Sequence, residues 1–121
     1  MNDLNADKRL WRLVEALDQR IDDGAGPAYH EQPLAQDWAR VAKVQEEAGE
    51  AVDALIGVTA QNHRKGEYGS WEHLFDELAD VALTGVYAIQ HFTKDVDRTR
   101  AIFLARAERH AERVGIDLDM S

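Results

Sequence analysis

The chain contains no cysteine, which excludes a disulfide framework, a thiolate zinc site and a thiol nucleophile. Helix breakers are also scarce, with 8 glycines and 2 prolines in 121 residues. Because alanine and glutamate are frequent instead, the composition is typical of a mostly helical protein. No apolar run is long enough to cross a bilayer, and the segment Met1–Asp7 has no signal-peptide pattern. We therefore expect a single cytoplasmic domain that covers residues 1–121.

Basic residues are outnumbered as well: 14 Lys and Arg stand against 23 Asp and Glu, for a formal net charge of −9. This balance argues against a nucleic-acid polymer as partner, since binding to phosphate backbones relies on a basic surface. It argues equally against binding to anionic membranes. Two interpretations of the acidity remain: general solubility, or acids gathered at one place to hold a cation.

Apolar residues recur with helical spacing in four segments. The first begins near Leu4 and stops at a breaker-rich loop, residues 22–33, while Ser70 and Gly115 are suited to begin the third helix and end the fourth. The four expected helices are about 4–21, 34–59, 71–92 and 96–114. No segment alternates as a strand would. The predicted fold class is all-α, a four-helix antiparallel bundle.

Acids spaced three apart lie on one face of a helix, and Glu47/Glu50 and Glu77/Asp80 are such pairs. Their number alone is uninformative, since random placement of so many acids gives similar numbers of pairs, and a solvated charged face is the simpler interpretation. Asp80 differs because it is the only charge between Leu78 and Ile89. We expect this apolar stretch to be buried, so that Asp80 needs a salt-bridge partner or a metal.

Glu47 and Glu50 lie at the edge of the apolar face of the second helix, where they can meet Glu77 and Asp80. Four converging carboxylates repel one another unless a cation lies among them, and such oxygen ligands suit Mg²⁺ or Mn²⁺. The histidines do not favour another metal. None follows a glutamate at the spacing of di-iron bundles, and no two have zinc-site spacing.

The segment 43–50, Lys-Val-Gln-Glu-Glu-Ala-Gly-Glu, followed by Glu77-Leu-Ala-Asp80, resembles the Glu-Glu-x-x-Glu … Glu-x-x-Asp signature of the MazG-like all-α NTP pyrophosphatases. The loop 61–66 is similar to that of short single-domain members, and the resemblance covers about 38–113. It implies Mg²⁺-dependent hydrolysis of a nucleoside triphosphate to the monophosphate and pyrophosphate, for house-cleaning or control of the dNTP pool. It also implies assembly as a homodimer or homotetramer.

The resemblance also assigns roles to residues. Glu47, Glu50, Glu77 and Asp80 would bind metal, with Glu47 also catalytic, and Glu46 would orient the attacking water or approach a second metal. Relatives contact phosphate through a Lys-x-x-x-Asn-x-x-Arg pattern on the last helix, where this chain has Arg106, His110 and Arg113. A solvated Arg/Glu face is the alternative there. Further phosphate or nucleotide candidates are Lys43, Asn62, Arg64 and Lys65.

Base recognition in relatives uses aromatic stacking, which makes Trp38 the candidate here. Trp38 and Trp71 have core packing as their alternative, and Trp11 is expected in the core. Two other functions stay open: a phosphoribosyl-ATP pyrophosphohydrolase-like enzyme, and a non-catalytic helical interaction or regulatory module whose acids are ordinary surface. Dependence on metal distinguishes the enzymes from the module.

Overall fold

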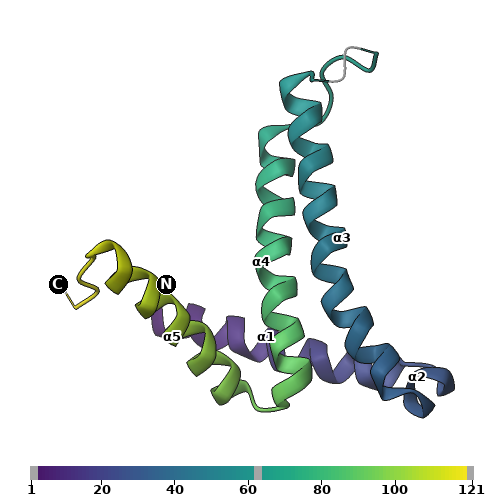
Figure 1. Ribbon diagram of the computed structural model, residues 1–121, viewed down its shortest axis with the longest axis vertical. Coiled ribbons are helices and arrows are strands. Elements are labelled where there is room, and N and C mark those ends of the chain that lie inside the picture. The colour runs from purple at the N-terminus through teal and green to yellow at the C-terminus, as the bar shows by residue number, and fades with distance from the viewer. Residues whose placement is uncertain (1–2, 62–63, 120–121) are drawn as a thin grey trace.

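The computed structural model describes residues 3–61 and 64–119, and over these residues it is helical, without strands. The helices are α1 (Asp3–Gly24), α2 (Pro27–Glu31), α3 (Pro33–Thr59), α4 (Trp71–Thr93) and α5 (Val96–Val114) (Figure 1). The all-α class and the four long helices are thus confirmed. The segment expected as a loop contains the short α2, which begins at Pro27, where a missing N–H costs nothing.

The ends of the long helices follow signals in the sequence. Ser70 Oγ accepts a hydrogen bond from the His73 backbone N–H at 3.1 Å and begins α4. Asp95 caps α5 by accepting bonds from two backbone N–H groups of its first turn. Gly115 ends α5 in the left-handed region at φ +74°, where glycine has no steric cost. Local chemistry therefore explains where these helices begin and end.

Helices α3 and α4 pack side by side as an antiparallel hairpin, and α1 crosses one end of it (Figure 1). Over the described residues, α5 packs against α4 and α1, and neither α1 nor α5 packs closely against α3. The buried apolar residues are few and mostly small: Val14, Ala51, Ala54, Leu74, Val86, Ala88 and Ala111. No helix in the described part of the chain is long and apolar enough to span a membrane.

Much of the apolar surface of the hairpin is uncovered in the single chain. Trp38 is 74% exposed and Trp71 52%, so the alternative that places them in the core is wrong. Trp11 is only partly buried, and its Nε1 donates to Asp7 at 2.9 Å. Helical periodicity identifies an apolar face but does not say whether another helix covers it, and here α1 and α5 cover only one end of the hairpin.

An ion-pair network attaches α1 to the hairpin. Asp18, which is buried, accepts hydrogen bonds from Arg40 Nη2 at 2.9 Å and from Lys94 Nζ at 2.8 Å. Lys94 Nζ also reaches Asp22 at 2.6 Å. Burial lowers the pKa of Lys94, but the hydrogen bonds and charges of Asp18 and Asp22 outweigh this effect and raise it above its ordinary value. Next to this network, His91 Nε2 lies 2.7 Å from Asp37 Oδ1.

Candidate functional site

Three of the predicted metal ligands converge between α3 and α4. Glu47 on α3 and Glu77 and Asp80 on α4 each contribute a carboxylate oxygen, and these oxygens all lie within 4.8 Å of one another. Glu77 and Asp80 share a face because they are three residues apart on one helix. The antiparallel pairing of the hairpin brings Glu47 opposite them. We call Glu47, Glu77 and Asp80 the acidic cluster.

The carboxylates of the acidic cluster have few compensating partners. The side chains of Glu47 and Glu77 are only 13% and 14% exposed. Glu77 Oε1 lies 3.5 Å from His73 Nε2, and Glu47 Oε1 lies 3.5 Å from Lys43 Nζ. Glu77 Oε2 is inaccessible to solvent and has no hydrogen-bond partner among the described residues. A buried carboxylate oxygen without a partner is costly, so this oxygen is suited to bind a cation.

Glu50 and Glu46 are placed differently. Glu50 is exposed and lies outside the acidic cluster, and its role as a fourth ligand stays a prediction. Glu46 is exposed too, and its Oε1 lies 3.1 Å from Lys43 Nζ. The prediction that Asp80 is buried is wrong, because Asp80 is exposed. The nearby Leu78, on another face of α4, is 52% exposed as well.

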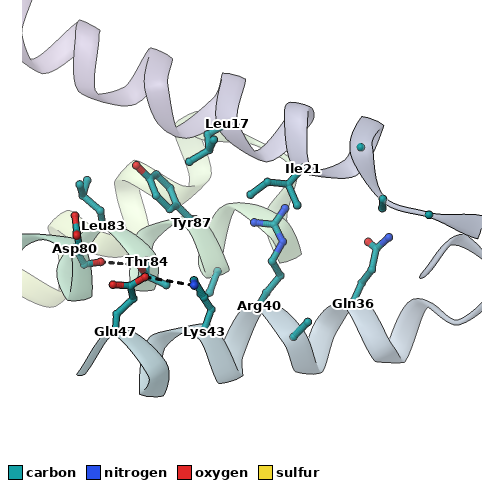
Figure 2. A pocket seen from close by; sticks show the side chains of 15 residues that line it. Leu17, Ile21, Gln36, Arg40, Lys43, Glu47, Asp80, Leu83, Thr84 and Tyr87 are labelled. Atoms are coloured by element: carbon teal, nitrogen blue, oxygen red, sulfur yellow. Dashed lines mark hydrogen bonds and ion pairs between the residues drawn. The ribbon is translucent and has the colours of Figure 1, made fainter. Parts of the chain in front are cut away.

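A cavity of about 770 Å³ adjoins the acidic cluster and lies between α1 and the hairpin (Figure 2). Its volume is in the range of small-molecule sites. Leu17 and Ile21 of α1 form one apolar wall, and Leu83 and Tyr87 of α4 form another. Burial, together with the negative charge of Asp80, raises the pKa of the Tyr87 hydroxyl. The polar side chains that line the cavity are Gln36, Arg40, Lys43, Glu47, Asp80 and Thr84.

Of the predicted phosphate-binding residues, Lys43 lies at this site. Its hydrogen bond to Glu46 raises the pKa of Lys43, against a smaller lowering by burial and with further raising by the charges of Glu46 and Glu47. The loop with Arg64 and Lys65 follows the other end of α3, about 18 Å along the helix from Glu47. Lys65 Nζ there lies 5.5 Å from the centre of the Tyr68 ring. Asn62 lies outside the described residues.

The three candidates on α5, Arg106, His110 and Arg113, are exposed and are not brought to the acidic cluster within one chain. Helix α5 leads away from the hairpin (Figure 1). Trp38, the base-stacking candidate, does not line the cavity. These residues could act at the site only from a neighbouring copy of the chain.

Sequence reasoning missed several residues that line the cavity, above all Gln36, Arg40 and Tyr87. One signal was available. Asp80, Thr84 and Tyr87 follow one another at helical spacing and place polar atoms on one face of an apolar helix. Gln36, Arg40, Lys43 and Glu47 do the same on α3. No comparable pattern in the sequence identifies the residues of α1 that line the cavity, because their position depends on tertiary packing.

Comparison with models of known protein families, with curated proteins and with solved structures finds no match. The chemistry of the site therefore follows from its residues alone. They combine a cluster of oxygen ligands, one lysine and an adjoining cavity with apolar walls. This combination is suited to a molecule that has a phosphate chain at one end and a flat, partly apolar group at the other.

Proposed function

We propose that this chain is a Mg²⁺-dependent nucleoside triphosphate pyrophosphohydrolase of the MazG-like all-α type, which cleaves an NTP or dNTP into the monophosphate and pyrophosphate. The observation that carries the proposal is the acidic cluster at the edge of the cavity, where one buried oxygen of Glu77 has no hydrogen-bond partner within residues 3–61 and 64–119. A merely solvated acidic face would have its carboxylate oxygens in water.

The donor set fits Mg²⁺ or Mn²⁺, because it consists of carboxylate oxygens alone. Glu47, Glu77 and Asp80 would hold the ion, and Glu50, one turn along α3 from Glu47, is the fourth ligand of the proposal. The ion, when bound, supplies charge neutralisation of the phosphate oxygens and a lowered pKa of bound water.

The residues of the chain have separate tasks in this hydrolysis. A water oxygen bonds to phosphorus, the anhydride bond between the α- and β-phosphates breaks, and pyrophosphate leaves. Glu46 accepts the proton of the water, since it is exposed, directly precedes Glu47 on α3 and shares the partner Lys43 with it. Lys43, which lines the cavity beside Glu47, exchanges its carboxylate partners for phosphate oxygens. Both residues are exposed enough to move for these tasks.

We further propose that the chain acts as a homodimer or homotetramer. Its accessible surface is 9221 Å², whereas a compact monomer of 13.6 kDa exposes about 6,600 Å². The excess is well above the roughly 800 Å² that one partner buries in a standard interface. Val52 on α3 and Phe75 on α4 are among the exposed apolar residues that a second copy would cover. Light scattering should give a molar mass of two or four times 13.6 kDa for the wild type, and a smaller molar mass for Phe75→Glu. A monomeric wild type would refute this assembly.

The activity is tested by measuring pyrophosphate release from canonical and modified NTPs and dNTPs and from phosphoribosyl-ATP, with and without Mg²⁺. We expect Mg²⁺-dependent release that Glu47→Gln abolishes. The matched control is Glu72→Gln, an exposed glutamate of α4 outside the acidic cluster. Cleavage of phosphoribosyl-ATP alone would favour the related enzyme. If no nucleotide is cleaved and Mg²⁺ leaves the melting temperature unchanged, the chain is a non-catalytic helical interaction module.

A further inference from the structure

The side chains of α3 that line the cavity follow a fixed order along the helix. Gln36, Arg40, Lys43 and Glu47 project from α3 toward α1 (Figure 2), at spacings of four, three and four residues. With a rise of 1.5 Å per residue, Gln36 lies about 16 Å along the helix from Glu47. Carboxylates thus mark one end of the cavity and a carboxamide the other, with the apolar walls between them. A nucleotide has the same order of groups: phosphates, then sugar and ring faces, then the polar edge of the base.

Gln36 is the polar side chain at the far end that is available for a ligand. It is partly buried and makes no side-chain hydrogen bond with any residue that the structure describes. Arg40, by contrast, is held by Asp18 at 2.9 Å. A glutamine amide presents a donor and an acceptor side by side, so it can pair with the edge of a base.

We infer that Gln36 reads the base of the nucleotide, whose rings lie between the walls formed by α1 and α4. This inference rests on the proposed function, because the acidic cluster fixes where the phosphates lie. Since the amide can turn over, Gln36 pairs with amino bases such as adenine and cytosine and with keto bases such as hypoxanthine and uracil. A carboxylate at the same position can only accept, so its best match is guanine, whose N1–H and N2–H donate side by side, whereas each of the other four bases offers it a single donor beside an acceptor.

Calorimetry with α,β-imido analogues of ATP, GTP, ITP and UTP in Mg²⁺ tests this role without turnover. GTP and ITP differ only in the 2-amino group of the purine, which gives guanine a second donor beside N1–H. We expect Gln36→Glu to raise the ratio of GTP-analogue to ITP-analogue affinity by about tenfold or more. Gln36→Leu should weaken all four analogues and leave binding of inorganic tripolyphosphate unchanged. The matched control is Gln45→Glu, at an exposed position of α3 that does not line the cavity.

The outcomes separate this inference from the proposed function. If the wild type binds the analogues but Gln36→Glu leaves the GTP-to-ITP affinity ratio as it is in Gln45→Glu, Gln36 does not read the base, and the hydrolase proposal is unaffected. If the wild type binds neither the analogues nor tripolyphosphate, both are overturned. Circular dichroism of each variant establishes that the helical content of the protein is unchanged.

Discussion

Replacing Asp18 by asparagine should destabilise the protein, because Asp18 links α1 to the hairpin. The Asp18 side chain is 5% exposed and receives hydrogen bonds from Arg40 and Lys94. Asparagine has nearly the same shape but no charge, so the substitution removes the ion pairs and leaves the packing. It also tests whether the α1 wall of the cavity depends on this network.

The magnitude follows from the exposure of the two cations. Removing one partner of a buried ion pair costs roughly 3–5 kcal/mol, because the other charge stays buried and uncompensated. The Arg40 side chain is 11% exposed and, of the acids in the described part of the chain, would keep Asp22 alone, at 3.8 Å. Lys94 is 47% exposed and keeps Asp22 at 2.6 Å, so its contribution is small. We therefore expect a loss at the lower end, about 3 kcal/mol, a large part of the 5–15 kcal/mol typical of a domain.

Urea unfolding followed by far-ultraviolet circular dichroism measures this loss. Protein concentration has to be the same for all variants, since assembly contributes to the free energy of unfolding. Glu15→Gln, at an exposed position of the same helix, should change the free energy of unfolding by less than about 0.5 kcal/mol. A loss below about 1 kcal/mol for Asp18→Asn would refute the reasoning, because the network would then not hold α1 in place.

Three further predictions concern stability. A Cβ at Gly57 would lie 2.6 Å from the Tyr68 carbonyl oxygen, so Gly57→Ala should lower the free energy of unfolding in urea by about 1–3 kcal/mol. In Gly49→Ala the Cβ meets nothing within 4 Å, so this substitution should raise the free energy of unfolding by up to about 1 kcal/mol. Equal effects of the two substitutions would contradict this reasoning. Ser70→Ala should cost about 1 kcal/mol by removing the cap of α4, and Ser70→Asp should retain the stability. The raised pKa of Lys94 gives stability that is complete below its ordinary pKa and is lost as pH rises through the folded value. Thermal melts above about pH 10 should therefore show a steeper decline for the wild type than for Lys94→Met, and identical slopes would refute this.

The sequence predicts the long helices well, because the signals that define them are local. Periodicity gives their extents, and Ser70 and Gly115 mark two of their ends. The position of α1 could not be predicted in this way. It depends on Asp18 meeting Arg40 and Lys94, which are 22 and 76 residues away along the chain, and no local pattern encodes such pairs.

The acidic site was predictable in part for the same reason. Helical spacing places Glu77 and Asp80 together, and the position of Glu47 at the edge of the apolar face of the facing helix made it a candidate partner. The exposure of Asp80 was not predictable, since it depends on which parts of α4 the other helices cover. The cavity also escaped the sequence analysis, because its walls come from three helices and Gln36 belongs to no motif.

Binding of Mn²⁺, followed by electron paramagnetic resonance with Mg²⁺ as competitor, tests most directly whether the acidic cluster holds a metal. The wild type should bind Mn²⁺ and release it to Mg²⁺. Glu77→Gln should abolish binding, because it changes the carboxylate whose buried Oε2 has no partner among the residues that the structure describes, while Glu72→Gln should bind as the wild type does. No binding by the wild type, or equal binding by Glu77→Gln, would contradict the account.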